Sequence, residues 1–242
     1  MISADRIAAE IDQDLQAVGT PERAEKERAY LKSPLRFYGA TLPQIHAIVT
    51  ASWRRHGGLD HDTMVATVDL LWACAVFECR MAAEDLLEMG SSMLTTADLP
   101  LLERMLRGAG TWALVDGLAA GPLGDLDRRP PGIGPTIERW ATDDDVWIRR
   151  SALLAHLKAL RRGEGDIDRF LRLADAMLEE REFFIRKAIG WVLRDAGKKR
   201  PADVTAWLEP RIGRVSGVTI REAVKHLPTG DRDRLLDDYR RR

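Results

Sequence analysis

Apolar residues recur at spacings of three and four along almost the whole chain, and this periodicity predicts amphipathic helices. The alternation of apolar and polar residues that is typical of strands is absent. Glycine, proline, aspartate or threonine interrupts the pattern about every ten to twenty residues, which favours short helices joined by turns. The predicted helices cover about residues 4–17, 22–32, 42–56, 61–76, 79–90, 97–108, 111–120, 134–141, 144–162, 166–180, 182–196, 201–209, 217–226 and 231–241.

Residues that cap helices precede several of these segments. Thr20 stands before Pro21, and Asp60 or Asp62 precedes the apolar run of the segment 61–76. Three acids at positions 143–145 precede the segment 144–162. Such residues accept hydrogen bonds from free backbone N–H groups or interact favourably with the positive end of the helix dipole. They therefore support these helix starts.

Short helices that follow one another through short turns favour one architecture. Each helical hairpin has an apolar face that it cannot bury alone, so neighbouring hairpins stack. We therefore predict an all-α fold, an α-solenoid of stacked helical repeats with a concave side. The segment AAGPLGDLDRRPPGIGP, residues 119–135, is interpreted as a turn region inside the array. The whole chain, 1–242, is accordingly predicted to form a single domain.

The composition is that of a globular protein, with 45% hydrophobic and 31% charged residues. No apolar run is long enough to cross a bilayer, and the N-terminal residues lack an apolar signal segment. A cytoplasmic protein without membrane contact is expected. Cys74 and Cys79 lie in the apolar run LLWACAVFECR, which predicts two reduced, buried core thiols. No histidine or further cysteine stands at ligand spacing, so we expect no metal site.

The net charge of −1 conceals an uneven distribution. Residues 181–242 contain 16 Lys and Arg against 9 Asp and Glu, whereas the rest of the chain contains 21 against 29. A basic region of this kind is typical of a nucleic-acid surface, and it is equally compatible with a solvated face.

Several catalytic motifs are missing. The chain contains no GxxxxGK[ST], no GxGxxG after a strand, no HExxH and no GxSxG. These absences remove most of the support for nucleotide hydrolysis, dinucleotide chemistry, zinc proteolysis and an α/β-hydrolase.

Two helical segments in the middle of the chain combine a tryptophan with an ionisable residue. In TWALVDGLA, Trp112 and Asp116 are four residues apart and share one side of a helix. In DDDVWIRRSALLAHL, Trp147 and Arg150 are three apart, and Arg149 points elsewhere. Each has a structural alternative, a solvent-facing Asp beside a partly buried Trp in the first and an aromatic anchor with surface arginines in the second.

A third segment, EFFIRKAIGWVLRDAG, has two different faces. Lys187, Trp191 and Arg194 share one side, and an aliphatic stripe lies opposite. The structural alternative is a core tryptophan between cations whose alkyl stems cover apolar surface. A tryptophan between two cations is also a surface that can bind a polyanion.

The segments TWALVD, VWIRRSALL and EFFIRKAIGWVLRD, in this order and at this separation, resemble the signature segments of the AlkD-type DNA alkylation-repair glycosylases. Tyr30 in AYLKSPLRFYGA, followed by PQIHAIV, resembles the N-terminal segment of that family. The resemblance extends from about Ala29 to the segment REAVKHL at residues 221–227. EFFIRKAIGWVLR is its most specific part.

The resemblance implies HEAT-like repeats curved around duplex DNA, and excision of purines alkylated at ring position 3 or 7 without a cofactor. Trp112 and Trp191 match the two tryptophans that flank the damaged nucleotide, and Asp116 matches the essential carboxylate. Arg150 matches the arginine that engages the DNA backbone, although the local alignment leaves Arg149 as the alternative. Further positions near the DNA are Tyr30 and Arg194. The family holds the lesion without an enclosed base pocket, so bulky adducts would be tolerated.

The residues themselves are suited to this chemistry. An alkylated purine is already a cationic leaving group, so the enzyme must chiefly stabilise positive charge that grows on the deoxyribose. Asp116 can do so, and Lys187, Arg194 and Arg150 can neutralise phosphates. A lysine Schiff base is unnecessary for a leaving group that is already charged. The prediction is a monomeric, monofunctional alkylpurine DNA glycosylase; the alternative is a non-catalytic helical-repeat scaffold that binds DNA or protein.

Overall fold

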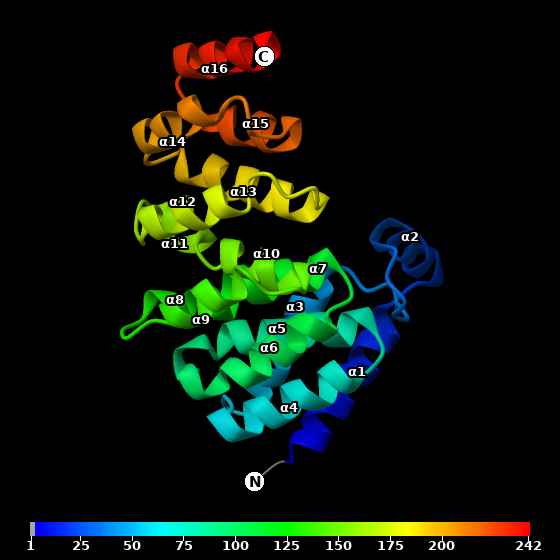
Figure 1. Ribbon diagram of the computed structural model, residues 1–242. Helices are drawn as coiled ribbons and strands as arrows, with labels where there is room; N and C mark the ends of the chain where they lie inside the picture. Colours follow the sequence, from blue (N-terminus) through cyan, green and yellow to red (C-terminus); the bar gives the residue numbers. More distant parts are fainter. Residues whose placement is uncertain (1–2) are drawn as a thin grey trace. The chain divides into compact units, whose positions relative to one another are not determined.

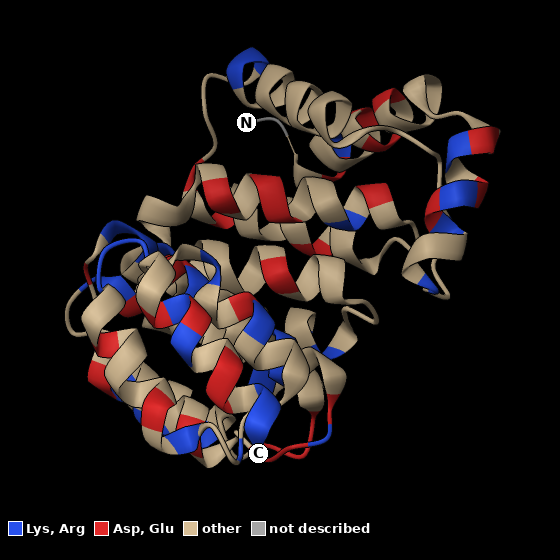
Figure 2. Ribbon diagram, turned by 90° about the horizontal axis from the view of Figure 1, so that it is seen from above, with Lys and Arg blue, Asp and Glu red and all other residues tan. Residues whose placement is uncertain are grey.

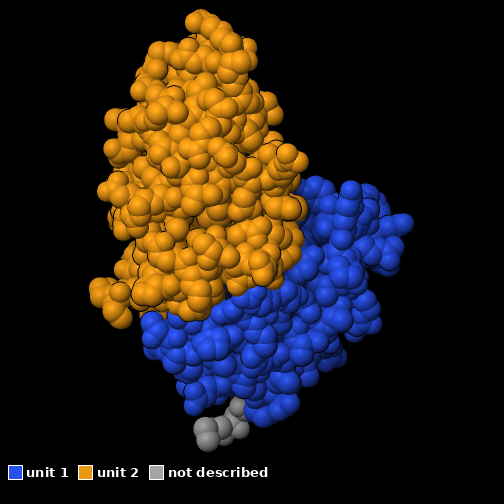
Figure 3. Space-filling model, viewed as in Figure 1, with its two compact units in different colours: residues 1–118 blue, residues 119–242 orange. Residues whose placement is uncertain are grey.

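The computed structural model describes residues 3–242, and every regular element in that range is helical (Figure 1). A single isolated bridge pairs Arg36 with Val76. The prediction of an all-α fold built from stacked helices is therefore confirmed. The contacts within the chain divide it into two compact units, Met1–Leu118 and Ala119–Arg242 (Figure 3). Each unit is described separately below, and the single domain 1–242 stays a prediction.

Unit 1 is built around α1, whose apolar residues repeat every four positions. Ile7, Ile11 and Leu15 of α1 are buried, and the helix packs against α3, α4 and α5. The elements of unit 1 are α1 (Ala4–Val18), α2 (Pro21–Leu31), α3 (Leu42–Arg55), α4 (His61–Ala73), α5 (Phe77–Met89), η1 (Ser91–Met93), η2 (Thr96–Asp98), α6 (Leu99–Gly108) and α7 (Trp112–Leu118). Asp60 caps α4 through a hydrogen bond from the Thr63 N–H, whereas Thr20 makes no side-chain cap on α2.

Unit 2 is a stack of short helices centred on α13, which packs against α10 and α11 and against α15. Figure 1 shows this succession from α8 to α16. The elements are η3 (Ala119–Leu123), α8 (Gly124–Arg128), α9 (Gly134–Trp140), α10 (Val146–Leu154), α11 (Leu157–Arg162), α12 (Ile167–Ala176), α13 (Phe183–Ala196), α14 (Pro201–Leu208), η4 (Glu209–Arg211), α15 (Gly217–Ala223), η5 (Val224–His226) and α16 (Thr229–Arg241).

Two predictions about helices in unit 2 are wrong. The segment 144–162 is not one helix, because it divides into α10 and α11 at His156. The His156 ring bonds to the Ala152 carbonyl, and the His156 N–H bonds instead to the Leu153 carbonyl, so the α-helical pattern is interrupted. The turn region 119–135 is also partly helical, since it contains η3 and α8. Gly124 allows α8 to approach α10, because a Cβ atom there would lie 2.8 Å from the Ala155 carbonyl oxygen.

Within residues 3–242, every helix is too short or too polar to meet the length and apolarity that a bilayer-spanning helix requires.

Candidate functional site

The short helix α7 of unit 1 carries two of the predicted site residues. Leu114, Val115 and Leu118 are fully buried, while Trp112 and Asp116 on the other side are only partly buried. This confirms the predicted division of the segment into an apolar side and a side that carries an indole and a carboxylate. Both latter side chains therefore reach the surface of unit 1 from adjacent turns of one helix.

Tyr30 of α2 lies against Trp112 although 82 residues separate them in sequence. The ring centroids are 5.9 Å apart and the planes meet at 86°, the edge-to-face geometry that aromatic pairs favour. Tyr30 remains 71% exposed. The structure thus brings together Tyr30, Trp112 and Asp116, three of the residues that the sequence indicated.

The position of α2 depends on its attachment to the rest of unit 1, since no residue of this helix is buried. The buried Glu78 of α5 accepts hydrogen bonds from the backbone N–H groups of Tyr38, at 2.9 Å, and Gly39, at 2.6 Å. Gly39 has a φ of +85°, and a Cβ atom there would collide with the Thr20 carbonyl. The turn before α2 and the segment after it are therefore held in contact, and α2 extends from this base.

A buried acid that was not predicted lies beneath α7. Glu84 of α5 is 5% exposed, its Oε1 atom has no hydrogen-bond partner among the described residues, and a Cβ atom on Gly117 would overlap its Oε2 atom. Burial, and then the negative charges of Asp85 and Asp116, raise the pKa of Glu84 well above its usual range. The fold therefore favours the protonated form of this side chain, which lies beside the helix that carries Asp116. The sequence does not single out Glu84, because α5 also contains Glu78, Asp85 and Glu88.

In unit 2, α13 has the two faces that its sequence predicts. Trp191 and Arg194 are partly buried and Lys187 is exposed. The opposite stripe is fully buried and consists of Ile185, Ile189, Val192 and Leu193. Lys187 Nζ lies 5.9 Å from the centre of the exposed Phe183 ring, a cation–π distance.

Trp191 is oriented by a buried aspartate four residues further along α13. The indole Nε1–H donates to Asp195 Oδ2 at 3.2 Å, and Arg161 donates to the same oxygen at 2.7 Å. Lys198 Nζ lies 2.7 Å from Asp195 Oδ1. Burial alone would raise the pKa of Asp195, but the hydrogen bonds from Lys198 and Arg161 outweigh it and hold that pKa below its usual value. Asp195 is therefore an ionised group that fixes the plane of the indole.

The predicted cations of unit 2 all contact protein groups. Arg194 pairs with Glu222 of α15 at 2.6 Å. Burial is the largest single influence on the pKa of Glu222 and raises it, but Lys225 and Arg194 together outweigh burial and lower that pKa below its usual value. Figure 2 shows basic and acidic residues side by side along the helices of unit 2, so the basic excess of residues 181–242 is partly neutralised within the unit.

The two candidate arginines of α10 differ in their surroundings. Arg150 is 1% exposed, donates a hydrogen bond to the Phe184 carbonyl and lies 5.7 Å from the Phe184 ring centre. Arg149 pairs with Glu180 at 3.0 Å and donates to the carbonyls of Asp143 and Asp144, so it joins the start of α10 to the connection between α12 and α13. A DNA contact by either arginine stays a prediction.

Three donor atoms in unit 1 are grouped closely enough to hold a metal ion. They belong to Asp12 of α1, Cys74 at the end of α4 and Cys79 of α5, and all lie within 4.8 Å of one another. Both thiols are free. Cys79 is fully buried as predicted, but Cys74 is only partly buried, because it follows the last residue of α4 where the chain turns outward.

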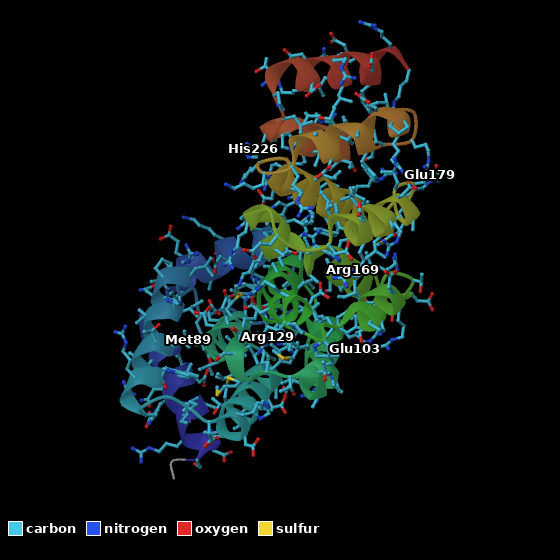
Figure 4. The ribbon with its side chains drawn as sticks, turned by 90° about the vertical axis from the view of Figure 1, so that its left-hand side faces the viewer. Met89, Glu103, Arg129, Arg169, Glu179 and His226 are labelled. Carbon is cyan, nitrogen blue, oxygen red and sulfur yellow. The ribbon has the colours of Figure 1, made fainter. Side chains whose placement is uncertain are left out.

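Two hollows lie away from the predicted site residues. One is an open groove of about 970 Å³ between α1, α2 and residues 33–38 of unit 1. The other is a cavity of about 270 Å³ in unit 2, lined among others by His156 and Arg169. Arg169 (Figure 4) donates to His156 Nε2 at 3.1 Å, and burial, followed by the charge of Arg169, lowers the pKa of His156 to about 4. None of the predicted site residues lines either hollow.

Comparison with known proteins identifies one matching family. The model of the family described as DNA alkylation repair enzyme matches residues 11–227. No curated protein matches the sequence significantly.

Solved structures share the fold of this chain at low sequence identity. A predicted DNA alkylation repair enzyme from Enterococcus faecalis superimposes with a TM-score of 0.78 at 23% identity, covering 87% of this chain and 97% of its own. AlkD2 from Streptococcus mutans gives a TM-score of 0.65 at 16% identity, covering 94% and 100%. The structure of smu.31 from Streptococcus mutans UA159 gives 0.59 at 18% identity, covering 77% and 93%.

Proposed function

Because the chain belongs to the DNA alkylation repair enzyme family, we propose that it is a monofunctional DNA glycosylase. It would hydrolyse the N-glycosidic bond of purines alkylated at ring position 3 or 7 in duplex DNA and leave an abasic site. The observation that carries this proposal is the pairing of Trp112 and Asp116 on the accessible side of α7, with the Tyr30 ring edge-on to the indole.

Asp116 is the proposed catalytic carboxylate. Loss of a cationic purine leaves positive charge on the deoxyribose, and a fixed anion nearby stabilises that charge in the transition state. The same carboxylate can orient the attacking water and accept its proton. Glu84 supports this role, because its surroundings favour the protonated form, which brings no second negative charge beneath α7 that would compete for the sugar cation.

The aromatic residues are proposed to hold the cationic nucleotide. The electron-rich faces of Trp112 and Trp191 favour a cation by about 0.5 to 2 kcal/mol each. Trp191 can do so at low entropic cost, since Asp195 already fixes its ring. Tyr30 limits the motion of Trp112 through their edge-to-face contact.

Lys187, Arg194 and one of Arg149 and Arg150 are proposed to neutralise phosphates of duplex DNA. Lys187 is the most exposed of these cations. Phosphate contacts position the duplex without reading its sequence, and they make binding strongly dependent on salt. We infer a monomeric enzyme in the cytoplasm that needs neither a metal nor an organic cofactor for the hydrolysis.

The test is an excision assay on duplex DNA that carries N3-methyladenine and N7-methylguanine. We expect release of the free methylated purines and the appearance of abasic sites, with no release from untreated duplex. A protein that folds and binds the duplex but releases no purine above the spontaneous rate would exclude the glycosylase and support the alternative, a helical-repeat scaffold. Separate quantification of the two bases establishes which is preferred.

A further inference from the structure

The group formed by Asp12, Cys74 and Cys79 has no role in the proposed glycosylase. Its members come from three places in the sequence, and folding of unit 1 brings their donor atoms within 4.8 Å of one another. Cys79 Sγ donates a hydrogen bond to Asp12 Oδ1 at 3.0 Å. Apolar packing alone does not require two thiols and a carboxylate to meet at one point.

We propose that Asp12, Cys74 and Cys79 form a binding site for Zn²⁺ in unit 1. Two sulfur ligands select a thiophilic cation over Mg²⁺ or Ca²⁺, which prefer sites made of oxygen ligands. The aspartate supplies the third ligand, since carboxylate oxygens are accepted ligands of Zn²⁺ besides Cys sulfur and His nitrogen. Both Asp12 and Cys74 are only partly buried, which leaves an entry path and a position for water as the fourth ligand.

The carboxylate of the site is already oriented by a neighbour. The Tyr38 hydroxyl donates to Asp12 Oδ1 at 2.9 Å, and the Tyr38 backbone is held by Glu78. Hydrogen bonds of this kind to a ligating group fix its direction and increase metal affinity. Tyr38 is therefore a positioning residue for the proposed metal site.

One fixed cation lies close to the donor atoms of the proposed site. Arg80 lies on the α5 turn that follows Cys79, and its guanidinium interacts electrostatically with Cys74. Its position is fixed, because it donates to the carbonyls of Trp72 and Gly108 and lies 5.0 Å from the Trp72 ring centre. This cation offsets part of the negative charge of a site with two thiolates and one carboxylate.

Binding is a ligand exchange without oxidation or reduction. Zn²⁺ loses bound water, forms two Zn–S bonds and one Zn–O bond, and the two thiol protons pass to solvent. The bound ion would tie α1 to the turn between α4 and α5. Its expected role is therefore structural, and it is independent of the excision chemistry proposed above.

The experiment is a titration of the reduced protein with Co²⁺, a spectroscopic substitute for Zn²⁺, followed by competition with Zn²⁺. We expect one equivalent of Co²⁺ to produce thiolate-to-cobalt charge-transfer absorption together with the visible bands of a tetrahedral ion. Zn²⁺ should abolish both signals at one equivalent, and excess Mg²⁺ should leave them unchanged. The melting temperature of the wild-type protein should rise with Zn²⁺ concentration.

Variants identify the ligands and guard against nonspecific binding. Cys74→Ser should abolish the charge-transfer signal, and Asp12→Asn should weaken binding more than Tyr38→Phe, for which we expect a loss of about ten- to a hundredfold. Asp14→Asn is the matched control, because this acid is also on α1 but pairs at 4.0 Å with Arg55. Absence of the signals in the folded wild-type protein, or equal Zn²⁺ affinity in Cys74→Ser, would overturn the proposal. The proposal would also be overturned if a disulfide between Cys74 and Cys79 explained the whole effect of Zn²⁺ on the melting temperature.

Discussion

Glu84 in unit 1 and Asp195 in unit 2 are both buried carboxyl groups next to predicted site residues, yet their pKa values are shifted in opposite directions. Glu84 lies beside Gly117 and close to further acids, and its pKa is raised well above the usual range. Asp195 receives hydrogen bonds from Trp191 and Arg161 and is close to Lys198, and its pKa is lowered. The surroundings therefore favour the protonated form of Glu84 and the ionised form of Asp195.

The difference shows that burial alone does not decide whether an acid is ionised. Burial raises the pKa of both groups, and the neighbours then decide the result. In unit 1 the neighbours are negative and favour the protonated form of the buried acid, and Asp116 remains the candidate anion. In unit 2 the anion is used internally to orient Trp191. We therefore expect chemistry to depend on unit 1 and ring orientation to depend on unit 2.

The largest effect is expected for Asp116→Asn. Removing the proposed carboxylate should lower single-turnover excision of N3-methyladenine by about a hundred- to a thousandfold, which corresponds to roughly 3 to 4 kcal/mol. The free energy of unfolding and the affinity for duplex DNA should change little. Asp69→Asn is the control, because this acid of unit 1 pairs with Arg104 at the surface. An equal loss of excision in both variants, or a comparable loss of DNA binding in Asp116→Asn, would contradict the assignment.

The next effect is on stability, in Asp195→Asn. Loss of the anion should lower the free energy of unfolding at pH 7 by about 2 to 3 kcal/mol, because hydrogen bonds to a charged group are lost. The lowered pKa means that this contribution is present above pH 3.8 and disappears as the pH falls through the folded-state value. Urea unfolding should therefore show that the difference in the free energy of unfolding between wild type and Asp195→Asn is present at pH 7 and is lost at acid pH, with pH 3 as the second measurement. The control is Asp203→Asn, on the exposed side of α14, whose free energy of unfolding should equal that of the wild type at both pH values.

A smaller effect on stability is expected when alanine replaces Gly190, which precedes Trp191, or Gly117, which follows Asp116. A Cβ atom on Gly190 would lie 2.9 Å from the Thr219 carbonyl oxygen, so Gly190→Ala must separate α13 from α15 and should cost about 1 to 2 kcal/mol. Gly117→Ala meets the end of the Glu84 side chain, which can move, and should cost less. Gly230→Ala, which meets no atom within 4 Å, is the control. Thermal unfolding ranks the three, and a larger cost for Gly117 would show that Glu84 is immobile.

The smallest effect concerns Glu84→Gln at low pH. Because the folded-state pKa of Glu84 exceeds its ordinary 4.5, the wild-type protein loses stability as the pH rises from 4.5 toward the folded-state value. The variant lacks this loss, since glutamine does not ionise. At pH 4.5 the two proteins should differ by less than about 1 kcal/mol, because one neutral group replaces another. At pH 8 the difference in stability should shift in favour of the variant, whereas Glu22→Gln, which removes an exposed acid of α2 that pairs with Lys26, should show no such shift. Parallel stability curves for wild type and Glu84→Gln would show that Glu84 is ionised.

Much of the helical structure could be predicted because it depends on neighbours in sequence. The stripe of Ile185, Ile189, Val192 and Leu193 has the period of a helix, and its burial follows from that period. The break at His156 could not be predicted, since it depends on a ring that bonds to the Ala152 carbonyl and to Arg169 of another helix. The helix α8 was missed for a similar reason, because its five residues approach Ala155 through Gly124.

Some features of the candidate site could likewise be predicted from the sequence, and others could not. That Trp112 and Asp116 share a side of α7 followed from their spacing of four, and the paired faces of α13 followed likewise. Three other features could not be predicted from spacing in the sequence. They are the contact of Tyr30 with Trp112, the burial of Arg150 and the closeness of Glu84 to Gly117. Each joins residues that are far apart in the chain.

The sequence by itself determined the all-α class, most helix boundaries and the side of each helix on which the ionisable residues lie. Only the tertiary structure decided that the pKa of Glu84 is raised, that the pKa of Asp195 is lowered, and that Asp12 meets two thiols. The physical reason is that helix formation and amphipathicity depend on residues within about one turn, four positions along the chain. The protonation state of a buried group depends instead on every charge and donor that folding brings beside it.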